Sequence, residues 1–130
     1  MKKENTVKTL WIGLFLGVVL AAANTGAAQA TNHACFDWSC NDTTYVCSFN
    51  SACTTLTNGQ LWRYRWDFGD GAGYYLTSSN LINNTYSSSL PYPTVTLTVI
   101  PLDTDPFSIT CEIVVYNNIG PPRATFGRCQ

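Results

Sequence analysis

The chain has 130 residues with seven basic side chains, eight acidic side chains and six cysteines, which is the length of one small domain. All three lysines fall within the first thirty residues; from Thr31 onward, four arginines are set against seven acidic side chains, a net charge of −3. This balance excludes nucleic acid as a partner, because phosphates require a dense basic surface. The same part holds one histidine, His33, and no lysine, which also excludes Schiff-base chemistry and multi-histidine metal sites.

The first thirty residues have the three parts of a secretory signal peptide. A short polar segment with lysines precedes an apolar run over residues 10–23, and Ala28-Gln29-Ala30 forms a small-x-small cleavage site. The apolar run is shorter than the roughly 20 residues that cross a bilayer. We therefore predict a signal peptide over residues 1–30, cleavage after Ala30, and a secreted or periplasmic product with no membrane attachment.

All six cysteines follow this segment, at Cys35, Cys40, Cys47, Cys53, Cys111 and Cys129. An even number of cysteines in a short exported chain predicts disulfides, and no Cys-x-x-Cys pair indicates a zinc site. Cys40 and Cys47 share their parity with aromatic residues on two neighbouring short strands, and a hairpin would bring the two face to face. We expect Cys40 to pair with Cys47, while the pairing of the other four stays open.

After residue 30, apolar side chains alternate with period two, which is typical of strands with one buried face. Five strands are expected, with these inward residues: Ala34, Phe36 and Trp38; Tyr45, Cys47 and Phe49; Trp62, Tyr64, Trp66 and Phe68; Val95, Leu97 and Val99; Ile109, Cys111, Ile113 and Val115. One or two more strands fit between residues 74 and 90. Short antiparallel strands separated by turn residues predict an all-β, immunoglobulin-like sandwich over residues 31–116. Residues 117–130 are expected to be an extended tail held by Cys129.

The segment Trp66-Asp67-Phe68-Gly69-Asp70-Gly71 is identical to WDFGDG, the core motif of the PKD (polycystic kidney disease) domain family. Tyr64 stands two residues before the tryptophan, as in the family's Y-x-W. Asn84-Thr85-Tyr86 resembles its H-T-Y, and residues 95–99 resemble its V-T-L-T-V. The chain thus resembles a PKD domain from Ala34 to Tyr116. This resemblance implies an immunoglobulin-like sandwich that acts as a non-catalytic extracellular interaction module.

The motif also has a physical interpretation. Tyr64, Trp66 and Phe68 lie on one side of a strand and are expected to form the centre of the core. Gly69-Asp70-Gly71 reverses the chain, with the carboxylate accepting backbone N–H groups. Asp67 and Asp70 suggest an acid–base pair, but turn aspartates usually satisfy backbone donors and no nucleophile accompanies them. We assign no catalytic residue and do not expect an enzyme.

Some PKD-like domains resemble calcium binders that use aspartates in the loop between the second and third strands. The corresponding loop here, residues 51–60, has no acidic side chain. Calcium requires about six to eight hard oxygen ligands. No metal and no other cofactor is therefore expected.

Tyr74, Tyr75 and Tyr92 are the candidate binding residues, joined by Trp38 and Tyr116 in an exposed aromatic platform. The alternative is that these rings pack on the strands of a sandwich edge. Arg63 and Arg65 should point outward, either to bind an acidic partner or simply as solvated side chains. Asn41 and Asn83 begin N-glycosylation acceptor sequences, which matter only in a eukaryotic host.

These observations favour an extracellular interaction module whose partner is a protein or a polysaccharide surface. One alternative is a carbohydrate- or biopolymer-binding protein that uses the exposed aromatic rings. A second alternative is an inhibitor of a secreted hydrolase, with one end of the sandwich inserted into the enzyme's cleft.

Overall fold

The computed structural model describes residues 31–57, 59–116 and 123–130. The predicted signal peptide, its cleavage site and residues 117–122 lie outside this part of the chain. Regular structure within it is entirely β, in eight strands: β1 (Phe36–Cys40), β2 (Val46–Asn50), β3 (Leu61–Asp67), β4 (Tyr74–Thr77), β5 (Leu81–Thr85), β6 (Thr94–Pro101), β7 (Phe107–Glu112) and β8 (Phe126–Cys129). The all-β prediction is confirmed, and β4 and β5 are the additional strands expected between residues 74 and 90.

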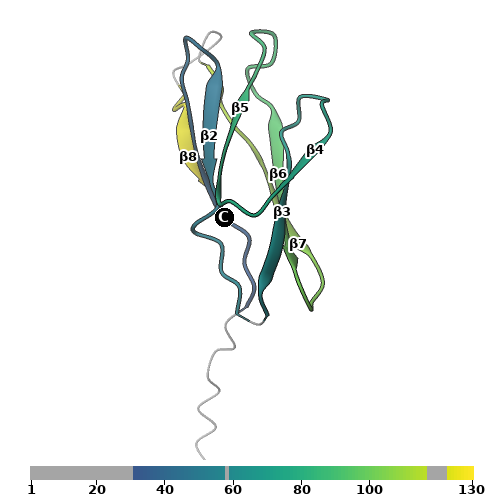
Figure 1. Cartoon of the computed structure of the whole chain (residues 1–130). Helices are drawn as coiled ribbons and strands as arrows, with labels where there is room; N and C mark the ends of the chain where they lie inside the picture. Colours follow the sequence, from purple (N-terminus) through teal and green to yellow (C-terminus); the bar gives the residue numbers. More distant parts are fainter. Residues whose placement is uncertain (1–30, 58, 117–122) are drawn as a thin grey trace, which may run out of the picture.

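The strands form two antiparallel sheets that pack face to face (Figure 1). One sheet has the order β5-β2-β1-β8 and the other the order β4-β3-β6-β7. The β1–β2, β3–β4 and β6–β7 pairs are antiparallel and consecutive in the chain, whereas β5 and β8 return to the first sheet after segments in the second. The immunoglobulin-like sandwich predicted from strand spacing is therefore confirmed.

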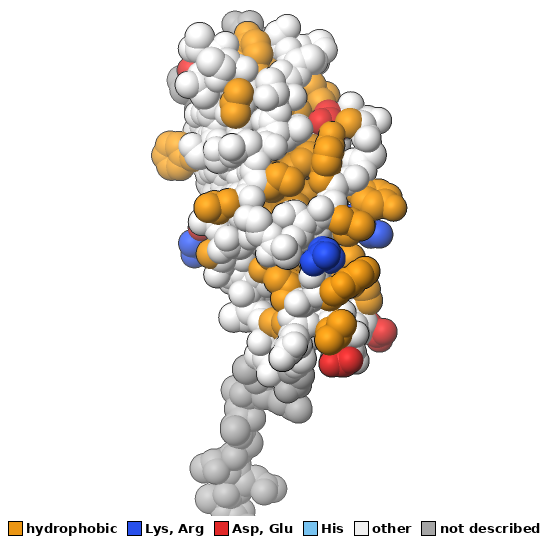
Figure 2. Space-filling model, viewed as in Figure 1, with side chains coloured by type: hydrophobic (Ala, Val, Ile, Leu, Met, Phe, Trp, Pro, Cys, Tyr) orange, Lys and Arg blue, Asp and Glu red, His pale blue; other side chains and the backbone are white. Residues whose placement is uncertain are grey.

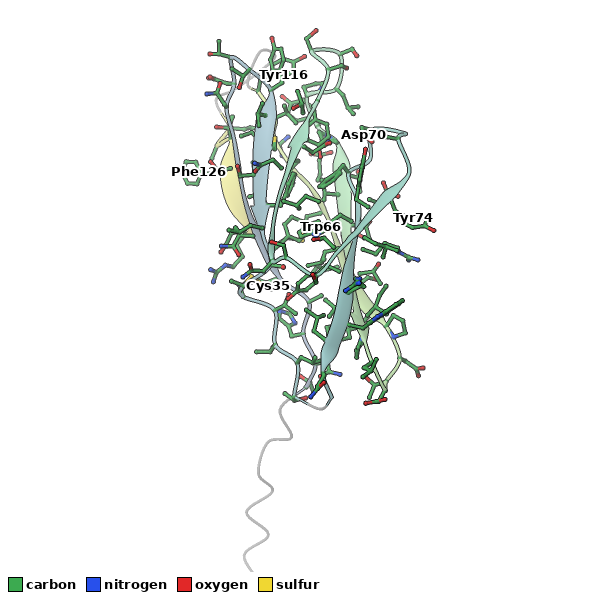
Figure 3. All side chains as sticks on the ribbon, viewed as in Figure 1. Cys35, Trp66, Asp70, Tyr74, Tyr116 and Phe126 are labelled. Carbon is green, nitrogen blue, oxygen red and sulfur yellow. A yellow bond between two sulfur atoms is a disulfide. The ribbon has the colours of Figure 1, made fainter. Side chains whose placement is uncertain are left out.

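Trp66 lies at the centre of the core between the two sheets, fully buried (Figure 3). Its ring centroid is 5.2 Å from that of Phe36 and 5.6 Å from that of Phe49, both on the opposite sheet. Phe68 stacks on it at 6.0 Å, and Tyr64 is buried beside it. Burial of these aromatic side chains gives the sandwich its main apolar contribution to stability, and the predicted inward residues Tyr64, Trp66 and Phe68 are confirmed.

Three disulfides connect the described cysteines: Cys35–Cys53, Cys40–Cys47 and Cys111–Cys129. Cys40 and Cys47 face each other in the β1–β2 register, as the hairpin argument expected. Cys111–Cys129 links β7 of one sheet to β8 of the other. The covalent links therefore act both within one sheet and across the sandwich.

The C-terminal segment differs from the expected extended tail. Residues 126–129 form β8, which pairs with β1 over four positions, with Phe126 opposite Ser39 and Arg128 opposite Asp37. Gly127 lies under the Trp38 ring, where a Cβ atom would come within 3.1 Å of Trp38 Cζ2. Because β8 completes the sheet, the sandwich extends beyond residue 116.

Trp62 was expected to point inward, and this prediction is wrong. The β3–β6 register shifts between Leu61 and Arg63, so alternation of faces breaks at Trp62. The ring is 50% exposed, and the Arg63 guanidinium lies over it.

Candidate functional site

Both aspartates of the signature turn hold the turn itself. Asp67 Oδ1 accepts a hydrogen bond from the Gly69 backbone N–H at 2.9 Å. Asp70 Oδ1 accepts one from the Ala72 N–H at 3.0 Å, and Asp70 Oδ2 accepts one from the Asn84 side-chain amide at 3.0 Å. Their oxygens thus accept hydrogen bonds from donors of the fold, two of them within the turn and one on β5.

Tyr86, the last residue of the signature set, also has a structural role. Its hydroxyl donates a hydrogen bond to the Phe68 carbonyl at 3.0 Å, and the side chain is buried. Burial raises the pKa of Tyr86 well above its usual range. The hydroxyl therefore stays protonated and fixes the end of the strand that carries Trp66.

The part of the chain that the structure describes contains no group of three or more His, Cys, Asp or Glu side chains able to hold a metal ion. The loop between β2 and β3 is fixed at Cys53 by the disulfide to Cys35. The Thr54 hydroxyl in the same loop donates to the Cys35 carbonyl at 2.8 Å. These two contacts hold the loop against the segment that precedes β1.

The predicted binding tyrosines do not lie on one surface. Tyr74 and Tyr75 are 63% and 44% exposed, but they are neighbours on β4 and point to opposite faces of the strand. The Arg65 guanidinium lies over the Tyr74 ring at 5.5 Å, whereas the Tyr75 ring packs on Phe68 at 5.6 Å. Tyr92 is half-buried before β6, with the Arg123 guanidinium 5.0 Å over its ring. The structure therefore places Tyr74 and Tyr75 on different faces of β4, and Tyr92 on a separate segment before β6.

The two further aromatic residues of the expected platform, Trp38 and Tyr116, pack against other parts of the chain. Trp38 is half-buried, and its ring covers Gly127. Tyr116 is buried; its ring packs on Tyr45, and its hydroxyl donates a hydrogen bond to the Ser88 carbonyl. Both residues support the fold and leave little ring surface for a ligand.

Exposed aromatic and cationic side chains do gather on the outer face of β3 and β4. We call this surface the arginine–aromatic patch; it consists of Trp62, Arg63, Arg65, Tyr74 and Leu76. Arg63 stacks over Trp62 at 5.7 Å and Arg65 over Tyr74 at 5.5 Å. Leu76 is exposed and stands opposite Arg65 in the β3–β4 register. Figure 3 shows Tyr74 projecting away from the sandwich, and Figure 2 shows hydrophobic side chains with interspersed arginines on the visible face.

A polar hollow of about 290 Å³ adjoins the patch. Its lining side chains come from three neighbouring strands of one sheet: Arg65, Asp67, Tyr74, Thr96 and Thr98. The Thr96 hydroxyl is hydrogen-bonded to the Thr110 hydroxyl at 2.8 Å, which fixes one side of the hollow. A guanidinium, a carboxylate and hydroxyls thus converge beside an exposed ring.

The two patch arginines keep their charge available. Within the described residues, salt bridges join Arg123 to Glu112 and Arg128 to Asp37, and neither involves Arg63 or Arg65. The Arg63 guanidinium donates one hydrogen bond to the Trp62 carbonyl at 3.2 Å. Guanidinium groups stacked on rings can still donate their other N–H groups to carboxylates. The patch is therefore locally cationic in a chain whose charge from Thr31 onward is −3.

Sequence reasoning anticipated only part of this patch. The outward direction of Arg63 and Arg65 follows from the alternation along β3 and is confirmed. The sequence alone did not indicate that Leu76 belongs to the patch, because its place beside Arg65 depends on the register of β4. To predict that Trp62 is exposed, the β-bulge between Leu61 and Arg63 would have had to be recognised.

No helix in the described ranges has the length and apolar character needed to cross a membrane. The family model of the PKD domain matches residues 27–105, more than half of the chain, and includes the signature turn. Comparison with curated proteins found no match.

Proposed function

The chain belongs to the PKD domain family, and from this premise we propose that it is an extracellular interaction module without catalytic activity that binds a protein through the arginine–aromatic patch. The family match and three disulfides support an extracellular location, since such bonds persist in oxidising compartments. The hydrogen-bonded turn aspartates support a non-catalytic role, because they hold the motif's backbone.

The observation that carries the proposal is the pair of stacked arginine–aromatic contacts on one sheet face. Tryptophan, tyrosine and arginine are the residue types that contribute most to protein–protein binding energy. Here the guanidinium groups restrain the rings before any partner arrives, which reduces the entropy lost on binding. Leu76 adds an exposed apolar side chain between the polar groups.

Charge defines the class of partner. Arg63 and Arg65 lie two residues apart on β3, so both point to the outer face. With no salt bridge in the described structure, they would attract carboxylates on the partner. We therefore infer a protein partner with acidic side chains around an apolar contact area.

A polysaccharide is the less favoured ligand. Sugars stack on open ring faces, but one face of Trp62 and one face of Tyr74 are covered by guanidinium groups. A hydrolase inhibitor that inserts one end of the sandwich is also less favoured, because the patch lies on a sheet face. The binding experiment described next distinguishes both alternatives from a protein partner.

The test is capture from the host's secreted proteins on the immobilised secreted chain, followed by measurement of Kd with the captured protein. Trp62→Ala, Tyr74→Ala and the charge-reversing Arg65→Glu should each weaken binding about tenfold or more. Binding should also weaken as salt rises. Leu81→Ala is the matched control, since Leu81 is a similarly exposed apolar residue on β5 of the opposite sheet.

Thermal melts of all variants establish that the fold is intact. Unchanged Kd for the three patch variants would overturn the assignment of the surface. If the chain is retained on insoluble polysaccharide and the same variants lose this retention, the ligand of the patch is a carbohydrate and not a protein.

A further inference from the structure

The outer face of the sheet β5-β2-β1-β8 has a regular pattern of side chains. Residues directly opposite in the strand register share a face, so two adjacent rows can be followed across the four strands. One row is Asn83, Ser48, Ser39 and Phe126; the next is Leu81, Asn50, Asp37 and Arg128. The central strands thus carry short side chains, while the two edge strands carry exposed apolar ones, Leu81 and Phe126.

The short side chains leave a hollow of about 170 Å³. Ser39 and Ser48 lie in its wall, with Asn50 and Leu81 beside them, and most of its accessible wall is apolar. An engineered apolar cavity of about 150 Å³ is large enough to hold benzene. The hollow is open on the outer face of the sheet, and its volume is similar to that needed by one phenyl ring.

Phe126 supplies a phenyl ring on the same face. Its side chain is 68% exposed, and Figure 3 shows it projecting from β8 away from the opposite sheet. Burial of so large an exposed apolar side chain in a contact would contribute favourable free energy.

The ring and the hollow lie at the same level along the strands. Phe126 stands opposite Ser39, which is in the wall of the hollow, and Ser48 stands opposite Ser39 on the other side. Phe126 lies on β8 and the hollow is centred near β2, so the two are about 10 Å apart across β1. A two-fold axis parallel to the strands and running over β1 would place each Phe126 above the hollow of the other copy.

From this geometry we propose that the chain forms a symmetric dimer through this face, in which Phe126 of each copy fills the hollow of the other. Such a contact is self-complementary and closed, as required for a two-fold dimer. Ser39 lies under the axis, and its small side chain lets the two sheets approach closely. The proposal concerns the opposite sheet from the arginine–aromatic patch and does not rest on the proposed function.

Charge favours a second copy over a charged partner. Asp37 and Arg128 form a two-pronged salt bridge on this face, with N–O distances of 2.6 and 3.0 Å, so their charges compensate each other. The remaining side chains of the two rows are uncharged. An axis over β1 brings the Asp37 carboxylates of the two copies close together, and the Arg128 guanidinium paired with each of them offsets their mutual repulsion.

The test is sedimentation of the secreted protein over a concentration series, with variants of the ring and of the hollow. The wild type should dimerise with concentration, and Phe126→Ser, which removes the ring, should raise the dimer Kd at least tenfold. Ser48→Phe, which fills the hollow, should do the same. Leu102→Ser is the control for loss of an exposed apolar side chain and should leave the dimer Kd unchanged.

A mixing experiment tests the symmetry of the contact. The Phe126→Ser variant keeps its hollow, and the Ser48→Phe variant keeps its ring, so a mixed dimer retains one of the two contacts. The mixture should associate more tightly than either variant alone, while thermal melts confirm that both are folded. A wild type that stays monomeric at every concentration, or variants that dimerise like the wild type, would overturn the proposal.

Discussion

The Asp70 carboxylate accepts a hydrogen bond from the Asn84 side-chain amide at 3.0 Å, and this contact joins the two sheets. Asp70 follows β3 in one sheet, whereas Asn84 lies in β5 of the other. The second oxygen of Asp70 holds the turn through the Ala72 N–H. One side chain therefore fixes the signature turn and its position against the opposite sheet.

Asp70→Ala should lower the free energy of unfolding by about 1 to 2 kcal/mol, because both hydrogen bonds are lost and one is partly buried. Asn84→Ala should be less costly, since it removes only the contact between the sheets. Denaturant unfolding of the two single variants and the double variant measures the coupling, which should be about 0.5 kcal/mol or more. Asp103→Ala, at an exposed site, serves as the control, and strictly additive losses would contradict the contact.

Gly69 and Gly71 have similar backbone conformations but different surroundings. Their φ angles are +68° and +81°, so alanine is strained at either position. A Cβ on Gly69 would lie 2.3 Å from the Thr94 carbonyl oxygen, whereas a Cβ on Gly71 meets nothing within 4 Å. Comparison of alanine variants at the two glycines therefore separates the effect of the steric contact from that of the backbone strain.

Gly71→Ala should therefore cost about 1 to 2 kcal/mol, the penalty for a left-handed residue with a side chain. Gly69→Ala should cost more than about 3 kcal/mol, because the backbone of β3 or of the β6 segment must also move. Urea midpoints of the two variants provide the comparison. Equal losses would show that Thr94 does not constrain the turn.

The Cys111–Cys129 bond should hold β8 against the sandwich. Replacing both cysteines by serine should increase hydrogen exchange at the β8 amides that pair with β1, because only four register pairs then retain the strand. Removal of Cys35–Cys53, which joins the segment before β1 to the loop after β2 and has the same sequence separation of 18 residues, is the matched control and should leave β8 protected. Unchanged protection in the Cys111 and Cys129 variant would show that β8 needs no covalent link.

Local alternation along the chain was sufficient to predict the core of β3 and the Cys40–Cys47 pair. The first follows from the alternation of side chains along a single strand, and the second from a short hairpin. Strand β8 could not be found in this way, because it has four residues, includes Gly127, and pairs with a strand about ninety residues earlier. Trp62 was misplaced for a related reason: a single bulge reverses the inward and outward assignment at its position.

Prediction of the candidate surface requires the strand register even more than prediction of the fold does. Tyr74 and Tyr75 are adjacent in sequence, yet the pleat sends one toward Arg65 and the other toward Phe68. Leu76 joins the patch because it stands opposite Arg65. Residue types therefore suggested an aromatic binding surface, but only the strand pairing determines which rings share a face.

Tyr86→Phe tests the hydrogen bond between the Tyr86 hydroxyl and the Phe68 carbonyl. The variant keeps the buried ring but leaves a buried carbonyl without this donor, so it should lose about 1 to 3 kcal/mol of unfolding free energy at neutral pH. Tyr74→Phe removes a hydroxyl from an exposed ring and should leave stability unchanged.

Comparison of the wild type with Tyr86→Phe also gives a pH-dependence with a definite sign. Burial raises the pKa of Tyr86 in the folded state above its ordinary value of about 10, so the unfolded state loses its proton first as pH rises. The stabilisation from protonated Tyr86 is therefore fully present below about pH 10 and is lost as pH rises toward the folded-state pKa. In alkaline denaturant titrations, the stability advantage of the wild type over Tyr86→Phe should shrink above pH 10. An advantage over Tyr86→Phe that persists undiminished across this range would show that Tyr86 is not held protonated in the core.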